Sequence, residues 1–166
     1  MAKQMTLKAP FTFEGKGLHT GLNVVLTVKP AAENTGRVVR RVDLENDNEI
    51  AALAENVTAT ERGTVLAKGE VKVSTIEHCM AALYAAGVDN CEIEVNAPEF
   101  PILDGSAKPF IEAINSVGVE EQSAEREYYE VTSKKVFTSE DGKSSITILP
   151  KSGAYAKSVI LSILPS

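Results

Sequence analysis

The sequence predicts a mixed α+β fold in which short strands come first and two helices follow. Apolar and polar residues alternate with a period of two over much of the first half, and the period then changes to helical spacing in two later segments. Hydrophobic residues make up 43% of the 166 positions and charged residues 24%, proportions typical of a globular chain with a sizeable core.

The clearest strand pattern lies at residues 22–29, where Val24, Leu26 and Val28 alternate with their neighbours. Segment 91–96 alternates strictly and predicts a strand after the first helix. Further short strands are expected at residues 36–43, 49–57 and 63–69.

The first helix is predicted around Ile76, Cys79, Met80 and Leu83, whose spacing follows the i, i+3, i+4, i+7 rule. Gly87 is well placed to end it. Four alanines occupy the other flank, so we expect this helix to be buried on more than one side.

The second helix is expected after residue 105. Ser106 is its candidate N-cap, Pro109 suits a first turn, and Gly118 is a plausible stop. Its apolar stripe is formed by Phe110, Ile111, Ile114 and Val117.

The last part of the chain predicts a second, smaller body. Segment 119–126 is polar and acidic and is interpreted as a linker. Strands are expected at 128–137, 144–149 and 159–164. The predicted organisation is a first domain at 1–122, a linker at 123–127 and the start of a second domain at 128–166.

Glu77 and His78 stand side by side at the start of the first predicted helix. An imidazole that can hold a metal, next to a carboxylate that can take a proton from water, is half of a zinc hydrolase site. The alternative is structural: Ser74 and Glu77 fit a capping box, in which Glu77 only satisfies backbone N–H groups. The only other histidine in the sequence is His19.

Two further candidates each have a structural alternative. His19 lies in the segment 15–21, which holds three glycines in seven residues; such a loop approaches a phosphate or sugar closely, or is simply a turn between strands. Asp104 is either a site carboxylate or a cap for the second helix.

Charge and composition exclude several classes of function. A formal net charge of −6 without a basic stripe argues against nucleic-acid binding. No apolar run is long enough to span a membrane, and the first eight residues lack the apolar stretch of a secretory signal, so a cytoplasmic location is expected. Cys79 and Cys91 form no Cys-x-x-Cys pair and are expected to be buried free thiols.

Six segments, in order and in register between about residue 3 and about residue 122, resemble the zinc-dependent UDP-3-O-acyl-N-acetylglucosamine deacetylases, the LpxC family of lipid A synthesis. The segments are Gly17-Leu-His-Thr-Gly21, Asn34-Thr-Gly36, Ser74-Thr-Ile-Glu-His78 with Ala81-Ala-Leu83, Gly87-Val-Asp-Asn90, Val95-Asn-Ala-Pro-Glu99 and Pro101-Ile-Leu-Asp-Gly-Ser-Ala107.

The resemblance implies two similar α/β domains, each a sheet layered with two helices, with the site between them. It implies hydrolysis of the 2-acetamido group of UDP-3-O-acyl-N-acetylglucosamine. By position, His78 is then a ligand of Zn²⁺ and Glu77 the general base, while His19 and Asp104 have a supporting role near the site.

The chain departs from the family's pattern in one respect. The family takes its remaining zinc ligands and a proton-donating histidine from its second domain, and no histidine follows His78 here. We therefore expect the chain to match the first domain with a stub of the second, and to be inactive alone. The alternative is a non-catalytic UDP-sugar-binding or regulatory module that keeps the first-domain fold.

Overall fold

The computed structural model describes residues 2–46, 48–150 and 160–163. The chain divides into two compact units, Met1–Arg126 and Glu127–Ser166. Within the described residues, none of the helices is long and apolar enough to cross a membrane.

The first unit is built on a five-stranded sheet with the order β2-β3-β9-β4-β5. Strand β9 pairs antiparallel with β3 and parallel with β4, so the two halves of the sheet meet at β9. Its elements are β1 (Lys3–Leu7), β2 (Phe11–Lys16), β3 (Asn23–Pro30), β4 (Arg37–Arg41), β5 (Glu49–Ala51), the 3₁₀ turn η1 (Ala54–Asn56), β6 (Val57–Ala59), β7 (Val65–Lys68), β8 (Val71–Val73), α1 (Glu77–Ala85), β9 (Cys91–Val95), α2 (Lys108–Val117) and β10 (Val119–Glu125).

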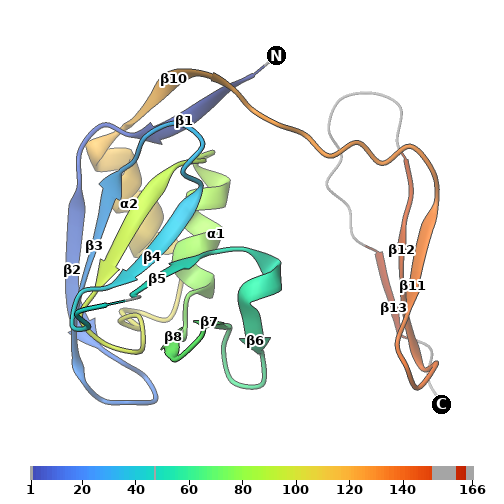
Figure 1. The fold of residues 1–166 in the computed structure, drawn as a ribbon, viewed down its shortest axis with the longest axis horizontal. Coiled ribbons are helices and arrows are strands. Elements are labelled where there is room, and N and C mark those ends of the chain that lie inside the picture. The colour runs from blue at the N-terminus through green and yellow to red at the C-terminus, as the bar shows by residue number, and fades with distance from the viewer. Residues whose placement is uncertain (1, 47, 151–159, 164–166) are drawn as a thin grey trace. The chain divides into compact units, whose positions relative to one another are not determined.

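Helices α1 and α2 lie together behind the sheet in the view of Figure 1, which gives the predicted α+β arrangement of a sheet against two helices. The core fills the space between these two layers because the strands alternate as their sequence predicts. Its fully buried members include Leu26, Val28, Ile93 and Val95 from the sheet and Leu83, Phe110 and Ile114 from the helices.

Both helices end where the sequence predicts, because a glycine with positive φ follows each of them. Gly87 has φ 73° and Gly118 has φ 79°, a backbone conformation that glycine adopts without strain. The expectation for the alanine flank of α1 was wrong in part. Ala81 and Ala85 are exposed, so the helix is buried on one side only.

The segment 119–126, predicted as a polar linker, is a strand over Val119–Glu125. Strand β10 pairs antiparallel with β1, with Leu7 opposite Val119 and Lys3 opposite Glu125. The division between the two units falls after Arg126.

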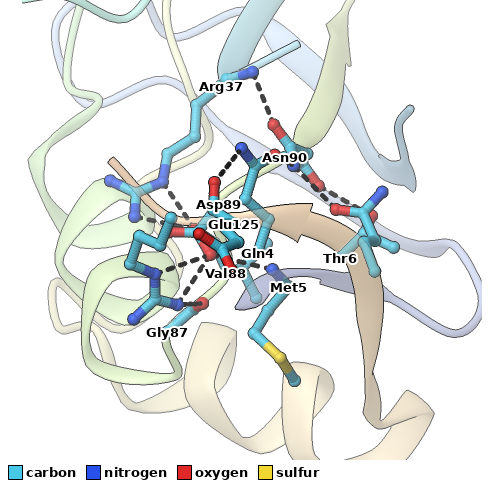
Figure 2. A network of polar contacts seen from close by, with 12 residues as sticks. Gln4, Met5, Thr6, Arg37, Gly87, Val88, Asp89, Asn90 and Glu125 are labelled. Carbon is cyan, nitrogen blue, oxygen red and sulfur yellow. Dashed lines mark hydrogen bonds and ion pairs between the residues drawn. The ribbon is translucent and has the colours of Figure 1, made fainter. Parts of the chain in front are cut away.

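Side-chain amides attach β1 and β10 to the rest of the first unit (Figure 2). The Gln4 amide donates to Asn34 Oδ1 at 2.7 Å, and its oxygen accepts from Asn90 Nδ2 at 2.8 Å. Asn90 also donates to Gln122 Oε1 at 2.7 Å and accepts the Gly36 N–H at 2.8 Å. Gln4 and Asn90 are buried, so their amides need these partners, and the contacts fix the position of both terminal strands.

The second unit contains a three-stranded antiparallel sheet of β11 (Lys135–Thr138), β12 (Ser144–Ile148) and β13 (Ile160–Ile163). The strand predicted at 128–137 is shorter than expected and begins at Lys135. The strand predicted at 159–164 is β13, whose two outer predicted positions lie outside the described residues. Large apolar side chains of this sheet are exposed, among them Phe137 at 56% and Ile146 at 39%.

Candidate active site

Glu77 is the first residue of α1, and His78 follows it; both side chains are half-buried. The Glu77 Oε2 atom accepts the Thr64 N–H at 2.9 Å. A Cβ atom at Gly63 would lie 3.4 Å from Oε1, so the glycine leaves space beside that second oxygen. Glu77 is thus held through one carboxylate oxygen while the other faces a position without a side chain.

The capping-box alternative for Ser74 and Glu77 is wrong. The helix has Ile76 at its N-cap, with no side-chain hydrogen bond there. The Ser74 hydroxyl instead donates to the Pro98 carbonyl at 3.3 Å. Because neither side chain caps α1, the Glu77 carboxylate is not tied to its own helix.

Thr75 takes a strained conformation just before the helix. Its φ is 60°, in the left-handed region that β-branched residues rarely adopt, at a cost of about 1–3 kcal/mol. The neighbouring backbone fixes it: the Ser74 N–H donates to Pro98 O at 3.0 Å, and the Phe100 N–H donates to Ser74 O at 3.0 Å. The segment that leads into Glu77 is therefore joined to the strand-like segment around residue 99.

Glu99, whose role sequence reasoning missed, is fully buried, with 0% of its surface exposed. Its Oε1 accepts the His19 N–H at 2.9 Å and the Thr75 hydroxyl at 3.1 Å. Its Oε2 accepts the Thr20 N–H and hydroxyl, both at 2.8 Å. Burial alone would raise the pKa of Glu99, but these donors together outweigh it and lower the pKa, so the carboxylate is ionised at neutral pH.

The glycine-rich segment closes around this carboxylate. A Cβ atom at Gly17 would lie 2.3 Å from Thr20 Oγ1 and 2.4 Å from Glu99 Oε2, so only glycine fits there. The backbone N–H groups of His19 and Thr20 point to Glu99. The turn interpretation of this loop is therefore correct, and those two N–H groups are not free for a phosphate.

The His19 ring reaches a second loop. Its Nε2 lies 3.0 Å from the Arg62 carbonyl oxygen, which can only accept, so Nε2 carries the proton. A cavity of about 210 Å³ lies beside this contact. It is lined by His19, Ala59, Glu61, Arg62, Gly63, Val65, Ser74 and Thr75.

A larger open cavity of about 1100 Å³ shares no lining residue with the one beside His19. It lies between the loop after β4 and the turn between β7 and β8, and its charged lining is mainly acidic. It holds neither histidine. The smaller cavity holds His19 and lies beside Thr75 and Gly63, but Glu77 and His78 are not among its lining residues.

Asp104 forms a short hydrogen-bonded turn with Ser106 just before α2. Its Oδ1 accepts the Ser106 N–H at 2.9 Å and the Ser106 hydroxyl at 2.8 Å. Ser106 Oγ in turn accepts the Lys108 N–H at 3.1 Å, although the helix N-cap position itself is Ala107. No side-chain hydrogen bond caps α2, so the cap predicted for Asp104 is not formed, and its supporting role near the site stays a prediction.

A complete metal site is absent from the described residues, which contain no group of three or more His, Cys, Asp or Glu side chains placed to hold a metal ion. His78 follows Glu77 in the sequence, and its imidazole is a nitrogen donor of the kind that zinc takes. Cys79 and Cys91 are buried free thiols, as expected, and burial raises the pKa of both, that of Cys91 to about 12.

Comparison with known proteins gives a consistent match. The family model described as UDP-3-O-acyl N-acetylglycosamine deacetylase matches residues 4–162. The chain is 57% identical over 150 residues to the bifunctional enzyme LpxC/FabZ of Bacteroides thetaiotaomicron, covering 90% of this chain and 32% of that protein. It is 45% identical over 150 residues to the UDP-3-O-acyl-N-acetylglucosamine deacetylase of Geotalea uraniireducens, covering 90% of this chain and 48% of the relative. The chain thus spans about a third to a half of the curated relatives it matches.

Proposed function

We propose a function from one premise: the chain belongs to the UDP-3-O-acyl N-acetylglycosamine deacetylase family. The proposed reaction is hydrolysis of the 2-acetamido group of UDP-3-O-acyl-N-acetylglucosamine in the cytoplasm, which releases acetate in the committed step of lipid A synthesis. Because the chain spans only part of its relatives, we propose this activity for the longer assembly in which the site is completed. The observation that carries the proposal is the Glu77–His78 pair at the start of α1, with one carboxylate oxygen anchored.

Each residue of the pair has a separate proposed role. His78 is one ligand of Zn²⁺, and the remaining ligands come from outside the described residues. When bound, Zn²⁺ supplies a Lewis acid that polarises the amide carbonyl. Glu77 is the general base: the Thr64 N–H holds Oε2, and Oε1, beside the space left by Gly63, takes a proton from the attacking water.

The base assignment is tested by Glu77→Gln in a longer protein that contains this chain and is active. A general base contributes about 10²–10⁴-fold, so we expect a fall of that size in kcat with zinc content unchanged. Normal turnover would contradict the base assignment. The 166-residue chain by itself is expected to show no deacetylase activity.

One observation favours a second candidate function. The absence of a three-ligand group among the described residues suits a non-catalytic module that binds a UDP-sugar. Saturable binding of a UDP-sugar by the 166-residue chain without hydrolysis, together with normal turnover of Glu77→Gln in the longer protein, would favour this alternative.

A further inference from the structure

Glu99 contacts two segments that both lead to Glu77. Its four donors come from three residues, two in the loop around His19 and one just before α1. A buried, ionised carboxylate needs donors on both oxygens, and Glu99 takes one of them from Thr75, directly before the helix. Each of the two segments can be traced from Glu99 to the Glu77 side chain.

The first connection runs along the backbone. Thr75 donates its hydroxyl to Glu99 Oε1 at 3.1 Å while its φ is held at 60°. Glu77 follows two residues later as the first residue of α1. The direction in which α1 begins, and hence the direction of the Glu77 side chain, depends on this strained residue staying where Glu99 holds it.

The second connection runs through the loop before β7. Glu99 accepts the His19 N–H, and the His19 ring donates from Nε2 to the Arg62 carbonyl at 3.0 Å. Two residues after Arg62, the Thr64 N–H donates to Glu77 Oε2 at 2.9 Å. The loop that anchors the Glu77 carboxylate is thus itself anchored, through His19, on Glu99.

We propose that Glu99 is a positioning residue that fixes the Glu77 carboxylate from two sides, through Thr75 along the backbone and through His19 and Thr64 in space. The inference rests on the proposed role of Glu77 as general base. Glu99 touches no reacting group in this account. It keeps one Glu77 oxygen bound to Thr64 so that the other stays available for the proton.

The test compares carboxylate-to-amide changes at the two ends of α1. The helix has nine residues and is about 13 Å long. Glu99→Gln acts near its first residue. Asp89→Asn is the matched control beyond its last residue, where Asp89 Oδ2 accepts the Met5 N–H at 2.8 Å and pairs with Arg126 at 2.6 Å. Both changes remove a hydrogen-bonded carboxylate, but only the first is connected to Thr64.

The measurement is the hydrogen-exchange rate of the Thr64 amide in the ¹⁵N-labelled 166-residue chain, with the ¹³C resonance of the Glu77 carboxyl as a second readout. We expect Glu99→Gln to raise the Thr64 exchange rate roughly tenfold beyond Asp89→Asn, the loss of about one hydrogen bond of protection. We also expect the Glu77 resonance to move only in Glu99→Gln. Equal changes in the two variants would overturn the proposal.

A third variant decides the question if Glu99→Gln does not fold. His19→Ala changes an exposed side chain and breaks only the contact with Arg62. Faster Thr64 exchange in His19→Ala supports the connection through His19, and an unchanged rate overturns it. Normal turnover of Glu77→Gln would remove the base assignment without affecting these exchange results, so the two failures are distinguishable.

Discussion

The two ends of helix α1 differ in how completely their polar groups are paired. Beyond the last turn, the Asp89 carboxylate accepts the Met5 N–H and pairs with Arg126, and Arg37 donates twice to the Val88 carbonyl, at 3.0 and 2.8 Å (Figure 2). Before the first turn, Glu77 has one oxygen bound to Thr64, and no hydrogen-bond partner is found for the His78 ring among the described residues. At the C-terminal end of α1, the closed end, the polar groups are paired within the chain. At the N-terminal end, the incomplete end, one Glu77 oxygen and the His78 ring remain available to bind a ligand.

The residues that stabilise this unit are therefore different from those that remain available for chemistry. A saturated polar network fixes geometry and has no capacity left for a ligand. The incomplete end is supported by the Glu99 carboxylate, whose two oxygens accept hydrogen bonds from four donors. This support keeps Glu77 in place and does not occupy its free carboxylate oxygen. Substitutions at the two ends should therefore change different properties.

The largest loss of stability is expected at the support itself. Gly17→Ala introduces a Cβ atom 2.3 Å from Thr20 Oγ1 and 2.4 Å from Glu99 Oε2, which forces the loop off the carboxylate at a cost of about 3 kcal/mol. Gly21→Ala is the control, because φ is +66° there but nothing lies within 4 Å, so it costs about 1 kcal/mol. Denaturant unfolding measures both, and equal losses would contradict the assigned packing.

A smaller loss is expected at the closed end. Asp89→Asn weakens the ion pair with Arg126. The side chain of Arg126 is 29% exposed and that of Asp89 is 25% exposed, so the change should lower the free energy of unfolding by about 1–2 kcal/mol. In an active longer protein the same change should leave kcat within about twofold, because Asp89 lies at the other end of α1. A fall in kcat as large as that of Glu77→Gln would break the distinction between the two ends.

Acid should weaken the hydrogen-bonded support that Glu99 provides at the incomplete end. The pKa of Glu99 is lowered in the fold, so its stabilising contribution is fully present above its ordinary value of 4.5 and is lost as pH falls through the lower folded value. Unfolding free energy measured from pH 6 to pH 3 should therefore fall below about pH 4.5, and Glu99→Gln should flatten this slope. An unchanged slope in Glu99→Gln would mean that other carboxylates account for acid sensitivity.

The smallest effect on stability is expected at the incomplete end. The His78 ring has no hydrogen bond to lose within the described residues, so His78→Ala should change the free energy of unfolding by less than about 1 kcal/mol. The melting temperature checks this. A loss of several kcal/mol would assign His78 to the fold and not to a metal.

Periodicity predicted the helices and the central strands because their residues are buried on one face. It failed for β10, where Val119–Glu125 is mostly polar and its pairing with β1 joins residues more than a hundred positions apart. Such a strand is formed by tertiary pairing and not by local pattern.

The residues of the candidate site also differ in whether the sequence predicts their role. Glu77 and His78 were recognisable as neighbours in the sequence, and the structure finds them together at one helix start. The role of Glu99 was not recognisable, because its donors lie 24, 79 and 80 positions away along the chain. The one local signal for burial of Glu99 was its position directly before Phe100, a large apolar residue that is fully buried.

The most direct test of the incomplete end is zinc content per chain in the purified 166-residue protein, after dialysis against a weak chelator. We predict little retained zinc, because the described residues contain no group of three or more His, Cys, Asp or Glu side chains placed to hold a metal ion. One tightly held zinc per chain, lost in His78→Ala, would contradict the account, since the site would then be complete within this chain.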